Sequence, residues 1–261
     1  MRLHVLGSSG GYSRADNPCT GFLLESGAAR IWIDAGHGTF AALRRVADFR
    51  HLDAIVLSHI HPDHCVDLYA LHVALLWGEG QGTKIPVYAP PGSRETLVPL
   101  LFSDGLAKFD GAFDYHEIDE GKEVEVKGVR GTFLRTQHPI HTLAMRLETP
   151  EGVLTYSSDT GPETDIARFA RGSDLALFEA TYQEAFRGAP VHISAKEAGE
   201  RAVRAEVGRL ALTHYWPPLD PRISLEEGAA AAPGIPVVSA EPGGVLEIGG
   251  SSAAPVKEGE P

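Results

Sequence analysis

The stretch that decides the fold is Ser58-His59-Ile60-His61-Pro62-Asp63-His64, where three histidines and one aspartate fall between positions 59 and 64. It follows Ala54–Ser58 (AIVLS), an apolar run typical of a buried strand that delivers a site at its C-terminal end. Imidazole and carboxylate are ligands that zinc, manganese and iron accept together. The competing interpretation is a polar loop with incidental histidines, and four ligand residues in so short a stretch argue against it.

The spacing within this stretch predicts two metal positions. His59 and His61 lie two residues apart in a loop leaving a strand, so their side chains can point the same way. Asp63 and His64 then fall on the first turn of a helix and can face a second position. One stretch could therefore supply half of the ligands for two metals.

Further candidate ligands follow later predicted strands. They are His138 after Gly131–Thr136, Asp159 after Val153–Ser157 and His214 after Arg209–Thr213. A single residue of this kind is ordinarily a surface or core residue. The repeated placement at strand ends matters, because neighbouring strands of a packed sheet converge there.

Apolar periodicity, punctuated by glycine and proline, predicts strands and helices in alternation. The predicted strands are Arg2–Gly7, Gly21–Glu25, Arg30–Asp34, Ala54–Ser58, Ile85–Tyr88, Val124–Val126, Gly131–Thr136, Leu143–Leu147, Val153–Ser157, Leu175–Phe178 and Arg209–Thr213. The predicted helices are Phe40–Ala47, one after Pro62 that carries Leu68, Leu71 and Leu75, Arg94–Phe102, Glu163–Ala170 and Ser194–Val207. This order predicts an α/β sandwich of two sheets with helices outside.

Composition limits the classes of protein to which this chain can belong. The chain has 261 residues, 43% of them hydrophobic, which suits one large domain over residues 1–249 with a flexible tail at 250–261. No apolar run approaches the roughly 20 residues that cross a bilayer, and nothing at the N-terminus resembles a signal peptide. The two cysteines, Cys19 and Cys65, make no disulfide scaffold, so we expect a cytoplasmic protein without a membrane partner.

The formal net charge of −12 bears on the substrate. Proteins that grip long nucleic acid usually carry a basic face, and the densest basic cluster here is only Arg44-Arg45 with Arg50. Bound cations can reverse the local field, so a phosphate substrate is still compatible with this charge. A small substrate is therefore expected over a large polyanion.

The SHIHPDH stretch resembles the HxHxDH signature of the metallo-β-lactamase superfamily. Ile33-Asp34-Ala35-Gly36 resembles the early strand-to-turn element of that superfamily, and the resemblance runs from about residue 2 to residue 216. It implies an αββα sandwich, two mixed sheets packed face to face with helices outside. It also implies a metal-dependent hydrolase.

The resemblance further implies a ligand set for two divalent ions, with zinc expected and manganese or iron as alternatives. The first ion would be held by His59, His61 and His138, the second by Asp63, His64 and His214, and Asp159 would bridge them. His141, three residues after His138, is a rival third ligand. Asp34 is expected to support the metal loop without binding metal.

Within the superfamily, the chain resembles the ribonuclease Z branch. The antibiotic-hydrolysing members place a cysteine ligand where this chain has Asp159. His192-Ile193-Ser194, Leu212-Thr213-His214 and Glu179-Ala180-Thr181 are similar to motifs of the ribonuclease Z branch. By that resemblance His192 acts near the scissile phosphate, whereas the alternative is a helix N-terminal histidine without catalytic importance. Glu179 is a candidate partner that fixes the His192 ring, or else a buried structural glutamate.

Two departures from ribonuclease Z favour a small phosphodiester, such as a cyclic nucleotide, as the substrate. The expected nucleophile is a metal-bridging hydroxide, formed from a water that Asp63 orients or deprotonates. His138 and Asp159 are only 21 positions apart, which leaves no room for the arm that bacterial ribonuclease Z uses to hold tRNA. The loop Gly7–Cys19 also lacks the basic, proline-containing segment of those enzymes.

Several alternatives stay open from the sequence. The chain could be a tRNA 3′-processing endonuclease of the ribonuclease Z type, or a carboxylic ester or lactone hydrolase on the same site. Outside enzymes, it could be a metal-stabilised binding or redox module. The apolar helix Leu68–Trp77 could form a homodimer interface or be buried in the core.

Overall fold

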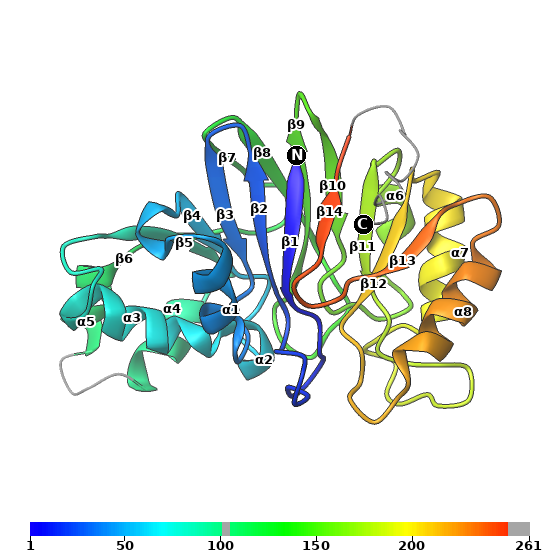
Figure 1. The fold of residues 1–261 in the computed structure, drawn as a ribbon, viewed down its shortest axis with the longest axis horizontal. Helices are drawn as coiled ribbons and strands as arrows, with labels where there is room; N and C mark the ends of the chain where they lie inside the picture. The colour runs from blue at the N-terminus through cyan, green and yellow to red at the C-terminus, as the bar shows by residue number, and fades with distance from the viewer. Residues whose placement is uncertain (101–104, 250–261) are drawn as a thin grey trace, which may run out of the picture.

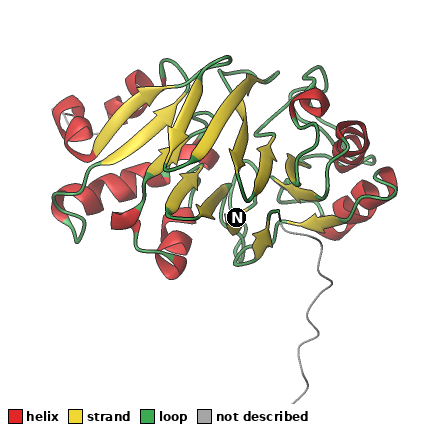
Figure 2. Cartoon of the chain, turned by 90° about the horizontal axis from the view of Figure 1, so that it is seen from above, coloured by secondary structure: helices red, strands yellow, loops and turns green. Residues whose placement is uncertain are grey.

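The computed structural model describes residues 1–100 and 105–249, which form two sheets packed face to face with helices on both outer sides (Figures 1 and 2). The predicted α/β sandwich of two mixed sheets with helices outside is therefore confirmed. The predicted tail at 250–261 lies outside the described residues. None of the described helices has the length and apolar character that crossing a membrane requires.

The first sheet has seven strands in the order β14-β1-β2-β3-β4-β5-β6. Their bounds are β1 Arg2–Gly7, β2 Gly21–Ser26, β3 Ala29–Ile33, β4 Ala54–Val56, β5 Ile85–Ala89, β6 Phe113–Glu117 and β14 Val245–Glu247. Strands β14 to β3 pair antiparallel, and β3 to β6 pair parallel. The parallel half points the C-terminal ends of β3 and β4 to the same edge of the sheet.

The second sheet also has seven strands, in the order β13-β12-β11-β10-β9-β8-β7. Their bounds are β7 Glu123–Val126, β8 Val129–Arg135, β9 Leu143–Thr149, β10 Gly152–Tyr156, β11 Leu175–Glu179, β12 Leu210–Thr213 and β13 Val237–Ser239. Strands β7 to β10 pair antiparallel, and β10 to β13 pair parallel. Strands β10, β11 and β12 therefore end side by side.

The helices cover the outer faces of the two sheets (Figures 1 and 2). Their bounds are α1 Thr39–Val46, α2 Pro62–Cys65, α3 Asp67–Trp77, α4 Ser93–Leu97, α5 Gly105–Ala112, α6 Ile166–Phe169, α7 Ala195–Ala205 and α8 Pro221–Ala231, with short 3₁₀ turns at Phe49–His51 and Val98–Leu100. As predicted, α3 buries Leu68, Leu71 and Leu75. Ser194 caps α7 and forms a capping box with Glu197.

Three apolar cores hold these layers together. One lies between the sheets and includes Phe22, Tyr156 and Leu177. A second joins the first sheet to α1, α3 and α5, and a third joins the second sheet to α6 and α7. Because both faces of the central strands are buried, these strands read as continuous apolar runs in the sequence.

The structure corrects several sequence predictions. Strands β6, β13 and β14 were not expected, and each lies at the edge of its sheet. An edge strand is short and half-exposed, so it has no strong apolar pattern; in β6 only Phe113 is buried. The helix predicted over Glu163–Ala170 is only Ile166–Phe169, because Asp165 caps it at that point. The helix predicted over Arg94–Phe102 is broken into α4 and a 3₁₀ turn, and residues 101 and 102 lie outside the described residues.

Candidate metal centre

The ends of four strands bring the seven candidate ligands together between the two sheets. They are His59, His61, Asp63 and His64 after β4, His138 after β8, Asp159 after β10 and His214 after β12. Helix α2, which carries Asp63 and His64, lies near the middle of the lower edge in Figure 1. Residues more than 150 positions apart therefore share one buried cluster.

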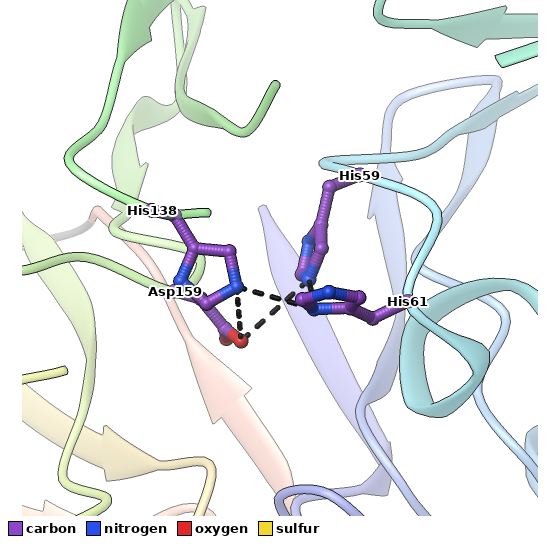
Figure 3. A group of neighbouring side chains, drawn as sticks. All are labelled: His59, His61, His138 and Asp159. Carbon is purple, nitrogen blue, oxygen red and sulfur yellow. Dashed lines mark hydrogen bonds and ion pairs between the residues drawn. The ribbon is translucent and has the colours of Figure 1, made fainter. Parts of the chain in front are cut away.

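His59, His61, His138 and Asp159 form the first group (Figure 3). His61 Nδ1 lies 3.2 Å from His59 Nε2 and 3.1 Å from His138 Nε2. Asp159 Oδ2 lies 3.6 Å from His59 Nε2 and 3.7 Å from His138 Nε2. Tetrahedral zinc with ligand bonds of about 2.0 Å separates its ligand atoms by about 3.3 Å, so these four atoms have the right spacing.

Asp63, His64 and His214 form the second group, and the other oxygen of Asp159 faces it. Asp63 Oδ2 lies 3.5 Å from His64 Nε2 and 3.2 Å from His214 Nε2. Asp159 Oδ1 lies 3.3 Å from His64 Nε2 and 3.2 Å from His214 Nε2. Asp159 thus presents one carboxylate oxygen to each group.

Hydrogen bonds fix which ring nitrogen faces the centre. His59 Nδ1 lies 3.0 Å from the Ser58 hydroxyl, His64 Nδ1 2.8 Å from Asp34, His138 Nδ1 3.2 Å from the Val191 carbonyl and His214 Nδ1 2.9 Å from the Thr181 hydroxyl. The Ser58 and Thr181 hydroxyls donate to carboxylates, so each is left to accept from its histidine. In all four rings the Nδ1–H is therefore the donor, and the Nε2 lone pair faces the cluster.

This arrangement fits divalent cations. His64 Nε2 and Asp159 Oδ1 are fully buried and have no hydrogen-bond partner among the described residues. In the first group, His61 Nδ1 faces the Nε2 atoms of His59 and His138 at 3.2 and 3.1 Å. Buried polar atoms are normally paired, and a cation between these atoms would satisfy all of them.

The protonation states suit the same role. Burial lowers the pKa of His59, His61 and His138, which keeps these rings neutral. Burial opposes ionisation of Asp63 and Asp159, but the adjacent histidines outweigh it and hold the pKa of both carboxyls below their ordinary range. Burial opposes the charged form of His64, but Asp159 and Asp63 outweigh it and raise the pKa of this ring. Neutral imidazoles and ionised carboxylates are the forms that bind metal, so a cation would bind here with loss of the His64 proton.

Asp34 stands directly behind this cluster and anchors it. Its carboxylate is fully buried and accepts hydrogen bonds from the Ser58 N–H at 2.7 Å, and from the Ser58 hydroxyl, the Tyr156 hydroxyl and His64 Nδ1 at 2.8 Å each. Asp34, Ser158 and His214 all have positive φ angles, between 52° and 56°. Strained backbone of this kind concentrates at functional sites, where the surrounding structure holds it.

We expect Asp34→Asn to weaken metal binding by about 10- to 100-fold without changing the fold, because an amide cannot accept from all four donors. Metal titration against a competing chelator measures this. Asp53→Asn is the matched control, since Asp53 also accepts a backbone N–H, from Arg30, but in another part of the molecule. Equal metal affinity in the two variants would contradict the anchoring role.

His192 lies beside the second group. Together with Asp159 and His214 it also forms a third set of residues close enough to hold a metal, so its role as a non-ligand stays a prediction. Its ring stacks at 5.5 Å on that of His214, and its Nδ1 lies 3.1 Å from Glu179 Oε1. Burial disfavours the charged ring, but the charge and hydrogen bond of Glu179 outweigh it and raise the pKa of His192 to about 9. Glu179 is fully buried and also accepts from the Thr160 N–H and the Thr181 hydroxyl. The expected pairing of Glu179 with the His192 ring is therefore present.

His141, the rival ligand, lies apart from the cluster. Its Nε2 is 2.9 Å from Asp119 Oδ1, and it belongs to none of the groups that could hold a metal. Four further residues that support the site were not predicted: Ser58, Tyr156, Thr181 and Gly11. Gly11 donates its N–H to Asp63 Oδ2 at 2.6 Å. Only contacts between distant segments reveal these roles.

A cavity of about 410 Å³ opens over the cluster. Its lining includes His61, Asp63, His138, Asp159 and His214, together with His192. Tyr182, Phe186, Val191 and Trp216 also line it, and no lysine or arginine does among the described residues. A substrate here would meet the candidate ligands, one further histidine and a largely apolar wall.

Comparison with known proteins identifies relatives of this chain. The family described as "Beta-lactamase superfamily domain" matches residues 29–215. An uncharacterised protein of Mycobacterium tuberculosis is 32% identical over 223 residues, covering 83% of this chain and 81% of that protein. A ribonuclease Z of Mycobacterium sp. (strain KMS) is 28% identical over 249 residues, covering 86% of each chain.

A third relative has a solved structure. The probable metallo-hydrolase YhfI of Bacillus subtilis is 28% identical over 222 residues, covering 82% of this chain and 86% of that protein. The crystal structure of YhfI, a metallo-β-lactamase fold protein, matches with a TM-score of 0.85 over 94% of this chain and 98% of that one, at 24% identity.

Proposed function

Given that the chain belongs to the β-lactamase superfamily domain family and is a metal-dependent hydrolase, we propose that it hydrolyses phosphodiester bonds in small substrates such as cyclic nucleotides. The observation that carries the proposal is His192, an imidazole that Glu179 holds at the wall of the metal cavity. A leaving alkoxide needs a proton, and this is the group placed to give it.

The proposal includes two divalent ions, with zinc expected. His59, His61 and His138 would hold one ion, Asp63, His64 and His214 the other, and Asp159 would give one oxygen to each. Two cations held this close would activate water and offset the charge on the phosphate.

The protein's own groups then have separate tasks. Asp63, fixed by the Gly11 N–H, orients the attacking water and is the candidate acceptor of its proton. His192 donates a proton from its Nε2 to the leaving oxygen, while Glu179 holds its Nδ1–H and keeps the ring in place. Tyr182, Phe186 and Trp216 exclude water from one side of the cavity.

Two features favour a small diester over tRNA, despite the likeness to ribonuclease Z. The segment between His138 and Asp159 is the hairpin β9–β10, which turns at Pro150 and Glu151 and forms no arm. The cavity lining described above has no lysine or arginine to hold the phosphates of an extended strand. A single diester anion needs no more positive charge than two cations and His192 supply.

The test is chromatographic product analysis on zinc-loaded protein offered 3′,5′-cyclic AMP, 2′,3′-cyclic AMP and a precursor tRNA in parallel. We expect conversion of a cyclic nucleotide to the monophosphate, with the precursor intact. Asp114→Ala, in the edge strand β6, is the active control. Cleavage of the tRNA alone would establish the ribonuclease Z alternative, and inertness to all three would point to carboxylic esters or lactones.

A further inference from the structure

Three aromatic side chains line the cavity without any role in holding the candidate metals. Tyr182 and Phe186 come from the loop after β11, and Trp216 comes from the loop after β12. We call these three residues the aromatic wall. They share one cavity with His192 and the candidate ligands, so a substrate bound at the metals would also reach them.

Trp216 is fixed against the same loop that holds Asp63. A Cβ at Gly11 would come within 2.7 Å of the Trp216 ring, so only glycine lets the indole pack on this backbone. The Gly11 N–H donates to Asp63, which places the indole directly beside the candidate centre. Tyr12 packs edge-on against Trp216, with ring centroids 5.6 Å apart, and supports it from outside.

Tyr182 is fixed on the opposite chain segment. Its hydroxyl donates to the Ala189 carbonyl at 3.1 Å, and a Cβ at Gly188 would collide with that hydroxyl. The Tyr182 ring lies edge-on to His192 at 5.8 Å. Phe186 packs at 6.3 Å from Tyr182 and is 46% exposed. The wall is thus rigid at Tyr182 and Trp216 and open at Phe186.

The chemistry of the wall indicates what it binds. Exposed aromatic rings beside a polar catalytic centre gain most from a planar partner, because stacking buries both faces. Apart from the candidate metal site and His192, the polar side-chain groups of the described lining are the Thr181 and Tyr182 hydroxyls and the Trp216 indole N–H. The aromatic wall therefore offers mainly flat apolar faces, and recognition here would depend mostly on the flat face of the ligand.

We propose that the aromatic wall binds the base of a nucleotide by stacking, so that the enzyme selects nucleotides over diesters without a planar group. This inference rests on the proposed function, because the metals and His192 would hold the phosphate while the wall holds the base. Trp216 is the main stacking residue, and Phe186 covers the base from the open side.

The test compares the binding of AMP and of ribose 5-phosphate to the zinc-loaded protein by isothermal titration calorimetry. The two ligands share a phosphate and a ribose and differ in the base. We expect AMP to bind at least about tenfold more tightly than ribose 5-phosphate, since stacking on one aromatic residue changes affinity by roughly 5- to 150-fold. In Trp216→Ala, the AMP affinity should fall to that of ribose 5-phosphate, which itself should not change.

Three further variants complete the test, one as a control and two within the aromatic wall. Trp77→Ala removes an exposed tryptophan of α3 that does not line the cavity, and it should bind both ligands like the wild type. Trp216→Phe keeps an aromatic face for stacking and should keep most of the preference for AMP over ribose 5-phosphate. Phe186→Ala removes an exposed ring, so it should fold normally and lose part of the preference.

Equal affinity of the wild-type protein for AMP and ribose 5-phosphate would overturn the stacking proposal, as would an unchanged preference in Trp216→Ala. Neither result bears on the proposed function, which depends on hydrolysis of the diester. Conversely, a strong preference for AMP in a protein that turns over no phosphodiester would keep the nucleotide site and overturn the proposed reaction.

Discussion

Asp159→Ala is expected to lower phosphodiester turnover by about 10³-fold or more and to reduce bound metal from two ions per chain to one or fewer. The carboxylate presents Oδ1 to one candidate group and Oδ2 to the other, so its loss removes a ligand from both. Metal charge supplies several kcal/mol of transition-state stabilisation, and each 1.4 kcal/mol is a factor of ten in rate. Elemental analysis of the purified variant and steady-state kinetics measure the two effects.

Asp114→Ala serves as the control for Asp159→Ala, since it removes an exposed carboxylate from β6. Circular dichroism should show that both variants fold, because the cores between and outside the sheets do not include Asp159. An Asp159→Ala protein that kept two ions and near-normal turnover would refute the shared-ligand assignment.

His192→Gln is expected to lower turnover of a cyclic nucleotide by about 10²- to 10⁴-fold while both ions stay bound. His192 is hydrogen-bonded to Glu179 and faces the cavity, and the proposed function gives it the task of proton transfer rather than metal binding. The effect should depend on the leaving group. An alkoxide such as a ribose oxygen needs the proton, whereas p-nitrophenolate leaves without it. Turnover of bis(p-nitrophenyl) phosphate should therefore fall far less.

His141→Gln is the matched control for His192→Gln, because His141 pairs with Asp119 outside the cluster. That variant should keep both metal content and turnover. Loss of metal from His192→Gln would show that His192 is a ligand. An equal loss of turnover on both substrates would show that it binds the phosphate without acting as an acid.

Sequence alone was sufficient to indicate the fold class and the seven candidate ligands. SHIHPDH concentrates ligands at the end of one buried strand, and His138, Asp159 and His214 each follow another strand. Such a pattern is local: a run of apolar residues forms a central strand, and the residues after it must lie at the edge of the sheet. The central strands were predicted for the same reason, whereas the edge strands β6, β13 and β14 were missed.

Only the tertiary structure showed the features that depend on contacts between distant segments of the chain. The orientation of each imidazole is set by partners such as Asp34 and Thr181, which lie 30 and 33 positions away from the rings that they hold. The two-sided placement of Asp159 arises only when both sheets pack together, and the aromatic wall forms where the loops after β11 and β12 meet. Metal ligands can be predicted from their spacing in the sequence, whereas the residues that hydrogen-bond to them or line the cavity follow no regular spacing. Their positions follow from the packing of the whole chain.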